Sequence, residues 1–194
     1  MPAEPAPGTA SRADPTAVET VAALATVATP RCGQVLVVAV DGPSGSGKTT
    51  LARAVGRRLD ARVLHMDALY PGWDGLSAAP EILTTDVLEP FARGVDAAYR
   101  RWDWVHARPA PERQPLVWTS RLVVEGCGSS ALPAGPYAAV HVWVEAPTPV
   151  RYARAMARDG DHYRPHWDRW AAQEQALFTG DRTRGRADLV ISTT

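Results

Sequence analysis

Residues 37–55 read VVAVDGPSGSGKTTLARAV, and this stretch decides the fold of the chain. It begins inside the apolar run QVLVVAV (34–40), which lacks polar alternation, as expected of a strand covered on both faces. Residues 42–49 then match the pattern GxxxxGK[ST]. After them, Leu51, Val55 and Leu59 recur at helical spacing. The sequence therefore predicts a strand, a glycine-rich turn and a helix in direct succession.

Such a turn suits a phosphate group. Glycines let successive backbone N–H groups converge on one point, and the helix adds its own unpaired N–H groups and positive dipole end. An ordinary flexible Gly/Ser loop is the alternative, but the strand before and the helix after favour phosphate binding. Lys48 is expected to reach the β- and γ-phosphates of ATP, and the Thr49 hydroxyl to hold Mg²⁺. The predicted nucleotide-binding residues of the turn are Gly42, Pro43, Ser44, Gly45, Ser46, Gly47, Lys48, Thr49 and Thr50.

The bulk properties exclude several classes of protein. The 194 residues carry 21 basic and 21 acidic side chains, which argues against bulk electrostatic binding to nucleic acid or an anionic membrane. The chain has no apolar run of about eighteen residues, and residues 1–30 lack the features of a signal peptide. Cys32 and Cys127 are expected to be buried, reduced thiols. A cytoplasmic enzyme of one domain is the expectation.

The rest of the chain alternates between strand and helix patterns. We expect a loose tail and a short packing helix over residues 1–30, and one domain over residues 31–194. Further strands are predicted within 61–67, 121–126, 137–147 and 186–193, and helices within 76–100, 148–159 and 167–178. This alternation predicts an α/β fold: a three-layer sandwich of the P-loop NTPase type, with a five-stranded parallel sheet and helices on both faces.

A phosphate loop alone does not name an activity, because GTPases, ATP-driven machines and small-molecule kinases all have one. The chain has neither the NKxD nor the DxxG pattern of a GTPase. It also lacks an apolar strand that ends in Asp-Glu, which a larger ATPase would carry. The small size and a possible acceptor site favour a kinase.

Two carboxylates follow predicted strands and are candidates for chemistry. Asp67 ends the second strand, where it could accept a proton from an attacking hydroxyl or help to hold the metal; the alternative is a helix N-cap. Glu125 ends the strand RLVVEG and could bind Mg²⁺; the alternative is a structural hydrogen-bond acceptor. Because the carboxyl ends of parallel strands share one edge, both are expected beside the phosphate loop.

The segment WDWVHAR (102–108) places two tryptophans around an acid. Aromatic faces stack on a planar base, and nearby polar groups could read its edge. The alternative is a hydrophobic plug between helices, and the sequence does not separate the two.

A mobile, arginine-rich lid is predicted over about residues 154–170. Arg154 and Arg158 lie four apart on one helical face, and Arg164 and Arg169 follow. Guanidinium groups that close over the phosphates would neutralise charge on the transferring group; a solvated basic helix face is the alternative. His162 and His166 have the spacing of a metal pair, but without a third ligand we expect surface histidines.

In combination, the phosphate loop, Asp67 followed by Tyr70, the strand VVEG (123–126) and the segment 102–108 resemble the uridine–cytidine kinase branch of the P-loop nucleoside kinases. The resemblance runs from about residue 34 to 191. It implies ATP and Mg²⁺ on the loop, Asp67 as the general base for the ribose 5′-hydroxyl, and Glu125 as a metal ligand alongside Thr49 and Asp67. For the lid it implies Arg158 as a catalytic residue and Arg154 as a nucleotide contact. The residues that it implies for the substrate are Tyr70, Asp74, Trp102, Asp103, Trp104, His106, Arg108 and Arg164.

The chain departs from that family pattern at the acceptor site. Trp replaces both aromatic residues of the base segment, one residue is missing before His106, and the stretch from Asp67 to Asp74 is short, so the hairpin over the nucleoside is expected to be trimmed. The expected function is ATP-dependent phosphorylation of a hydroxyl, first of all that of a nucleoside. A nucleoside monophosphate, another small alcohol or sugar, and a non-catalytic nucleotide-binding regulator stay open. The arginines that would serve a monophosphate are Arg100, Arg101, Arg108 and Arg113. The oligomeric state is left open.

Overall fold

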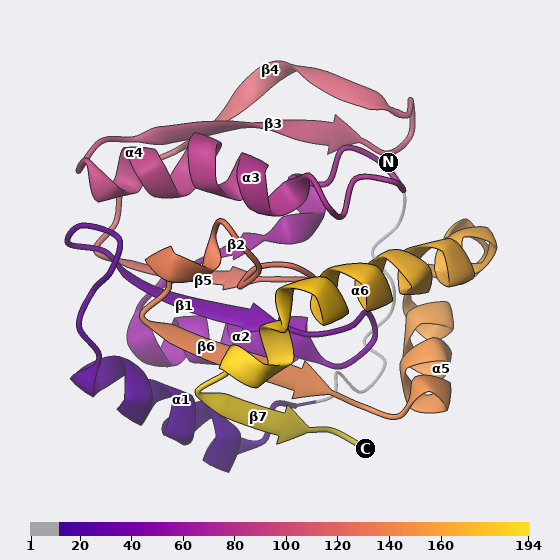
Figure 1. Cartoon of the computed structure of the whole chain (residues 1–194), viewed down its shortest axis with the longest axis horizontal. Helices are drawn as coiled ribbons and strands as arrows, with labels where there is room; N and C mark the ends of the chain where they lie inside the picture. Colours follow the sequence, from indigo (N-terminus) through magenta and orange to yellow (C-terminus); the bar gives the residue numbers. More distant parts are fainter. Residues whose placement is uncertain (1–11) are drawn as a thin grey trace.

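A parallel five-stranded sheet forms the centre of the molecule in a computed structural model, which describes residues 12–194 (Figure 1). The strand order is β2-β5-β1-β6-β7. The strands are β1 (Leu36–Asp41), β2 (Arg62–His65), β5 (Arg121–Glu125), β6 (Val140–Glu145) and β7 (Leu189–Ser192). All four strand pairs are parallel. The predicted α/β fold with helices on both faces is confirmed.

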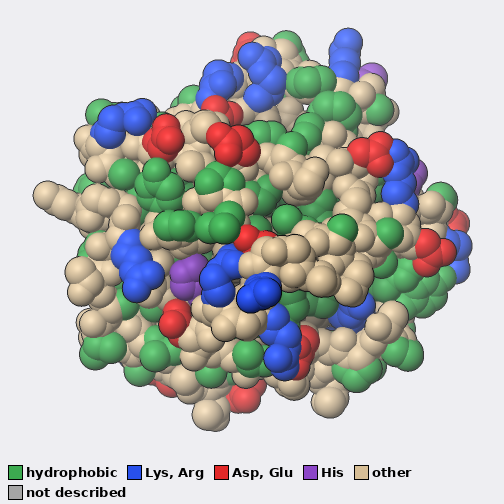
Figure 2. Space-filling model, in the orientation of Figure 1, with side chains coloured by type: hydrophobic (Ala, Val, Ile, Leu, Met, Phe, Trp, Pro, Cys, Tyr) green, Lys and Arg blue, Asp and Glu red, His purple; other side chains and the backbone are tan. Residues whose placement is uncertain are grey.

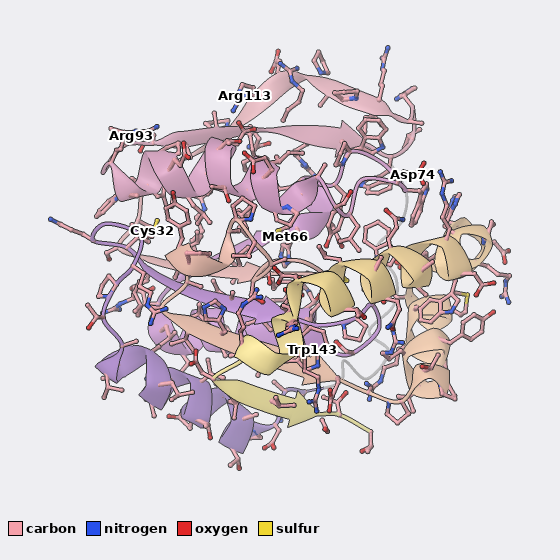
Figure 3. All side chains as sticks on the ribbon, in the orientation of Figure 1. Cys32, Met66, Asp74, Arg93, Arg113 and Trp143 are labelled. Atoms are coloured by element: carbon pink, nitrogen blue, oxygen red, sulfur yellow. The ribbon has the colours of Figure 1, made fainter. Side chains whose placement is uncertain are left out.

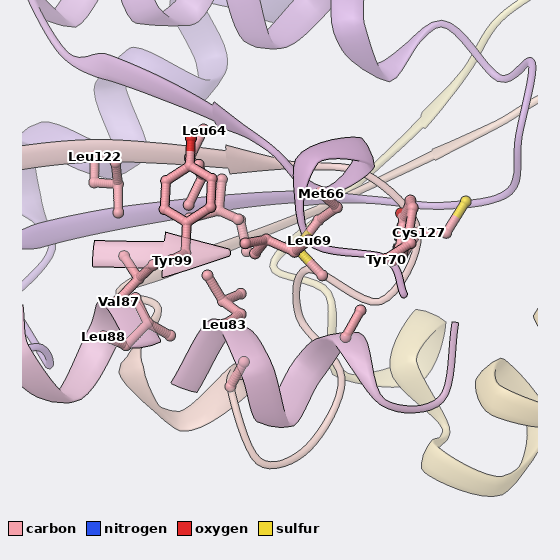
Figure 4. Close-up of a cluster of buried hydrophobic side chains, with 14 of the residues drawn as sticks. Leu64, Met66, Leu69, Tyr70, Leu83, Val87, Leu88, Tyr99, Leu122 and Cys127 are labelled. Atoms are coloured by element: carbon pink, nitrogen blue, oxygen red, sulfur yellow. Dashed lines mark hydrogen bonds between the residues drawn. The ribbon is translucent and has the colours of Figure 1, made fainter. Parts of the chain in front are cut away.

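The alternation of β1 side chains explains the two layers of helices. Val38 and Val40 face one side, where α1 (Pro15–Val27) and α2 (Lys48–Leu59) cover the sheet. Val37 and Ala39 face the other side, in a core that includes Leu64, Leu83, Leu88 and Leu122 (Figure 4). That core is covered by α3 (Ala79–Leu83), α4 (Glu89–Ala92) and α6 (Trp167–Asp181) (Figure 1). A strand buried on both faces is therefore continuously apolar, as the sequence indicated.

The helix α1 packs against α2 and belongs to the folded unit. The Asp14 carboxylate accepts the backbone N–H of Thr16 at 2.9 Å, and Pro15 is the first helical residue. Both features favour a helix start at this point. The predicted packing helix is thus present, whereas the expected tail over residues 1–11 lies outside the described residues.

The expectation of a mostly helical segment over 76–100 was wrong at its end. Residues 79–92 form α3, a π-helical turn (Thr84–Leu88) and α4, after which Gly94 adopts a φ of 77°. Residues 97–103 then form strand β3 (Ala97–Asp103), which pairs antiparallel with β4 (Arg108–Leu116). Ala97 and Tyr99 are buried while Arg100 is exposed, so the local period is that of a strand.

This hairpin also rules out one of the two alternatives left open for residues 102–108, the plug between helices. They form the end of β3, the turn and the first residue of β4, where Ala107 has a φ of 48°. The Asp103 carboxylate accepts the backbone N–H groups of Val105 and His106 at 3.0 and 3.1 Å, which stabilises the turn.

The C-terminal part consists of α5 (Thr148–Asp159), short helical turns at 160–166, α6 and β7. On the face drawn in Figure 2, basic and acidic side chains are interspersed. Within residues 12–194, none of the helices combines the length and the apolar character that a bilayer crossing requires.

Candidate active site

A cavity of about 760 Å³ opens at the carboxyl ends of the central strands. Its phosphate-loop side is formed by Ser44, Gly45, Lys48 and Thr49, and its floor by Glu125, Gly126 and Cys127. Ligands of open α/β sheets bind at this edge, because the loops that follow the strands converge there. The cavity therefore joins the predicted phosphate loop to both strand-end carboxylates.

Backbone geometry explains the glycines of the loop. Gly42 and Gly45 have φ values of 135° and 78°, and a Cβ on either would collide with backbone oxygens of Val144 and Arg151. Gly47, with a φ of 99°, is the N-cap of α2. Only glycine meets these conditions without strain. The Lys48 ammonium donates to the carbonyl of Pro43 at 2.8 Å, across the loop.

Lys48 is buried but remains a cation. Burial opposes its charge, but the nearby carboxylates of Glu174 and Glu125 favour the charged form, and the pKa of the ammonium is raised. A buried cation at the start of a helix attracts an anionic phosphate.

Asp41, the last residue of β1, holds the loop from below. Its carboxylate accepts the backbone N–H groups of Gly42, Gly128 and Ser130 at 2.7, 2.8 and 2.9 Å. Burial raises the pKa of Asp41, although these hydrogen bonds oppose the rise. This carboxylate ties the phosphate loop to the loop that follows β5. No sequence pattern assigned a role to Asp41.

Glu125 and Thr49 lie together at the cavity floor. The Thr49 hydroxyl is 3.1 and 3.2 Å from the two oxygens of Glu125, and His65 Nδ1 contacts one of them. Burial works against the Glu125 charge, but His65 and Lys48 outweigh it and hold the pKa of Glu125 below its ordinary value. An ionised carboxylate beside a hydroxyl is an oxygen donor set that fits Mg²⁺. Among the described residues no cluster of three His, Cys, Asp or Glu could hold a metal alone, so nucleotide phosphates and water would complete the coordination.

Asp67 and Arg158 lie in the same cavity. Desolvation raises the pKa of Asp67, and the charge of Glu125 raises it further, while Arg158 and Lys48 oppose the rise. A carboxylate with a raised pKa is a better general base than an ordinary one. The Arg158 guanidinium donates to Asp159 at 2.6 Å and keeps its charge.

The remaining wall of the cavity is aromatic. Trp73 stacks on His166, with ring centroids 4.2 Å apart and planes 14° apart, and Trp104 meets Trp73 edge-on at 4.9 Å. The Tyr70 hydroxyl donates to the carbonyl of Cys127 at 2.9 Å. The aromatic residues of this wall are Tyr70, Trp73, Trp104, Tyr163 and Trp170. Such a wall suits a planar, uncharged ring.

The structure brings only part of the predicted substrate set together. Tyr70 and Trp104 line the cavity, whereas the other predicted substrate residues do not: Asp74, Trp102, Asp103, His106, Arg108 and Arg164. Asp74 forms an ion pair with Arg169 at the surface, near the start of α6 (Figure 3). The Trp102 ring packs over Gly72, and Asp103 pairs with His106 at 2.7 Å.

Of the predicted lid arginines, too, some line the cavity and others do not. Arg158 lines the cavity, but Arg154 donates to the Thr193 hydroxyl and to the Thr194 carbonyl, both at 2.8 Å. Arg164 donates to the Tyr152 hydroxyl at 3.3 Å. His162 and His166, expected as surface histidines, both line the cavity.

The sequence patterns gave no role in the site to Asp41, His65, Trp73, Cys127, Tyr163, Trp170 and Glu174, which all line or support it. Cys127 is a buried free thiol, as expected, but it also lines the cavity 3.7 Å from Lys48 Nζ. Trp73 directly precedes Asp74, and His65 lies two residues before Asp67. Their closeness in sequence to two predicted site residues could have indicated that they belong to the site. Glu174 lies in the middle of a helix and had no local signal.

Comparisons with known proteins identify the family and the fold of the chain. Curated relatives match over short segments only: a cytidylate kinase of Rhodococcus jostii is 57% identical over 35 residues, and one of Corynebacterium glutamicum is 42% identical over 62 residues. These segments are 18% and 27% of this chain and 15% and 27% of the relatives, so the chain matches less than a third of either relative's length.

Solved structures match over nearly the whole chain, and they show the fold. A possible uridine kinase from Bacillus stearothermophilus has a TM-score of 0.67 at 17% identity, covering 91% of this chain and 97% of its own. A putative fructose transport system kinase from Silicibacter sp. has a TM-score of 0.56 at 18% identity, covering 90% and 97%. The fold that the resemblance implied is thus the fold of the molecule.

The family match covers the strands and loops that build the cavity. It extends over residues 38–173, which include the phosphate loop, both strand-end carboxylates, the hairpin and the predicted lid. The chain belongs to the AAA_18 family, described as an AAA domain, and its fold is that of a P-loop kinase.

Proposed function

We propose that the chain is a Mg²⁺-dependent kinase that transfers the γ-phosphoryl group of ATP to a hydroxyl of a small, uncharged acceptor with a planar ring, a nucleoside in the first place. The observation that carries the proposal is a single cavity that combines a phosphate loop, the carboxylate of Asp67 and an aromatic wall. A protein that only binds nucleotides needs the first of these and not the other two.

The donor is placed by the loop. The backbone N–H groups of the loop that follow Ser44, together with the Lys48 ammonium, would bind the β- and γ-phosphates. Thr49 and Glu125 would hold Mg²⁺, which shields phosphate charge when bound. Arg158 reaches the cavity from α5 and would stabilise charge on the transferring group.

The acceptor hydroxyl is activated by Asp67. Its carboxylate would take the proton of the hydroxyl as the oxygen attacks the γ-phosphorus and ADP leaves. The aromatic wall would hold the acceptor ring and exclude water, which otherwise competes as the acceptor.

The charges around the cavity favour an uncharged acceptor over a monophosphate. Among the residues that the structure describes, Arg158 is the one arginine that lines the cavity. Arg100 donates to backbone carbonyls of β4, and Arg113 pairs with Asp86 at 2.8 Å. Figure 3 places Arg113 on the hairpin, away from Asp74.

A nucleoside monophosphate is the second candidate, because the curated relatives that match over short segments are cytidylate kinases. It would require that Arg158 serve both the acceptor phosphate and the transferring group.

The test is an ADP-release assay with Mg-ATP and uridine, cytidine, UMP, CMP or a small sugar as acceptor. The proposal predicts ADP release that depends on a nucleoside, with phosphate found on its hydroxyl. Turnover only with CMP or UMP would establish the second candidate. Slow release that is independent of every acceptor would indicate a nucleotide-binding regulator.

A further inference from the structure

Helix α6 contributes a buried carboxylate to the phosphate loop from behind the cavity. The Glu174 side chain is 5% exposed and does not line the cavity. Its Oε1 accepts the backbone N–H of Ser44 at 2.6 Å and the thiol of Cys127 at 3.1 Å. A buried carboxylate is retained only where hydrogen bonds and a counter-charge compensate its desolvation.

The counter-charge comes from Arg151 on α5. Its Nη1 lies 3.5 Å from Glu174 Oε2 and donates to the carbonyl of Ser44 at 3.1 Å. The guanidinium also lies 5.6 Å from the centre of the Trp167 ring, at the start of α6. The N–H and the C=O of Ser44 are therefore held from two different helices.

These two helices flank the turns at 160–166, which form the middle of the predicted lid. The turns at 160–166 connect α5 to α6 and carry three residues of the cavity wall, His162, Tyr163 and His166. Because α5 and α6 both hold Ser44, their positions are linked to the orientation of the loop peptides. The backbone oxygen of Arg151 also occupies the space that a Cβ on Gly45 would need.

We propose that Glu174 is a positioning residue for phosphate binding, which together with Arg151 fixes the Ser44 peptide and couples the phosphate loop to the two helices that carry the lid. This inference rests on the proposed kinase function. The pair holds the loop in its binding shape before the nucleotide arrives, so ATP does not have to order it. Since Arg151 balances the charge of Glu174, the carboxylate supports the loop without repelling phosphate.

The first test is Glu174→Gln, measured as the Kd for Mg-ATP by calorimetry. The amide is isosteric and keeps an oxygen for the Ser44 N–H, but it removes the charge that pairs with Arg151. We expect Mg-ATP to bind about tenfold more weakly, in line with the loss of a buried, charge-assisted contact. Arg151→Lys keeps the positive charge but loses the planar guanidinium that contacts both Glu174 and Ser44, and we expect a smaller loss of Mg-ATP affinity. Unchanged or tighter binding in Glu174→Gln would overturn the inference.

Asp181→Asn is the matched control. Asp181 lies on the same helix and pairs with Arg186, but it does not touch the phosphate loop. We expect its Kd for Mg-ATP to equal that of the wild type. An equal loss of Mg-ATP affinity in Asp181→Asn would show that any disturbance of α6 weakens nucleotide binding, and it would contradict a specific role for Glu174.

The second test examines the phosphate loop in the nucleotide-free protein. It measures by mass spectrometry the rate at which iodoacetamide alkylates each cysteine. Cys127 contacts Glu174, whereas Cys32 donates to the carbonyl of Leu88 at 3.2 Å and lies at the amino end of β1 (Figure 3). In Glu174→Gln we expect several-fold faster alkylation of Cys127 and an unchanged rate at Cys32. Faster alkylation of both, or of neither, would contradict a local positioning role.

The two proposals fail in different ways. If wild-type protein does not bind Mg-ATP, the proposed function is wrong, and the alkylation rates still test whether Glu174 holds the loop. If the wild type binds Mg-ATP and Glu174→Gln binds it equally well, only the positioning role is wrong.

Discussion

The Thr49 hydroxyl lies 3.1 and 3.2 Å from the two carboxylate oxygens of Glu125, which joins the first turn of α2 to the end of β5. The two residues are 76 positions apart in the chain. The contact sets an oxygen pair beside the phosphate loop, and it is the basis of the first prediction.

Glu125→Gln should raise the Mg²⁺ concentration needed for half-maximal ATP binding by about tenfold or more, because the amide is a weaker ligand than the carboxylate. A Mg²⁺ titration at fixed ATP measures this. Binding of metal-free ATP serves as the internal reference and should change little. An unchanged Mg²⁺ requirement would leave Glu125 with a structural role.

Lys48→Ala should abolish the thermal stabilisation by Mg-ATP. A ligand at a hundredfold excess over its Kd stabilises a protein by about 2.7 kcal/mol, which a melting curve detects readily. Arg57→Ala, an exposed change on the same helix, is the control and should keep the full melting shift. A persistent shift in Lys48→Ala would count against phosphate binding at this loop.

Asp67→Asn should bind ATP within a few-fold of the wild type and lose phosphoryl transfer by about 10²–10⁴-fold, because an amide cannot accept the proton. Single-turnover measurements separate the two effects. Asp60→Asn is the control: Asp60 is the exposed C-cap of α2, with a φ of 50° that asparagine tolerates. If transfer survives in Asp67→Asn, another group is the base.

The pH profile of the wild type tests the same carboxylate. The base must be ionised, and burial together with Glu125 raises the pKa of Asp67. The acid limb of kcat/KM should therefore fall at a higher pH than about 3.9, the ordinary value for Asp. A limb at or below the ordinary value would contradict the environment described for Asp67.

Trp104→Ala should weaken nucleoside binding by roughly 5- to 100-fold and leave ATP binding unchanged, since stacking on a base contributes about 1–3 kcal/mol. Trp102→Ala is a matched control from the same hairpin, because its ring packs over Gly72 and does not line the cavity. Equal losses of affinity for ATP and for nucleoside in Trp104→Ala would indicate that this tryptophan only packs against its neighbours.

Arg158→Ala should lower kcat by about 10²-fold or more with little change in ATP affinity, because the guanidinium acts on charge that develops during transfer. Arg158→Lys should restore part of the rate. The same measurement on Arg154→Ala discriminates between the two predicted lid arginines, since Arg154 is engaged with the last two residues of the chain. A larger kcat loss in Arg154→Ala would reverse the assignment.

The sequence by itself determined the sheet and the phosphate loop. Both follow from local information: the central strands β1 and β5 contain continuous apolar runs, and the loop residues lie within nine consecutive positions that must adopt one backbone shape. The positions of Glu125, at the end of β5, and of Asp67, in the helical turn two residues after the end of β2, followed closely as well, because parallel strands end at a common edge. The hairpin was missed because Ala97 and Ala98 fit a helix as readily as a strand, and its buried face became evident only against the core.

Only the tertiary structure decided which side chains line the cavity. Trp102 and Trp104 are two residues apart, yet only Trp104 reaches the cavity wall, because the turn re-aims the chain between them. Ser44 and Glu174 are 130 residues apart and meet because α5 and α6 fold back over the phosphate loop. Contacts between side chains that are distant in sequence depend on how helices dock on the sheet, and no local pattern encodes that docking.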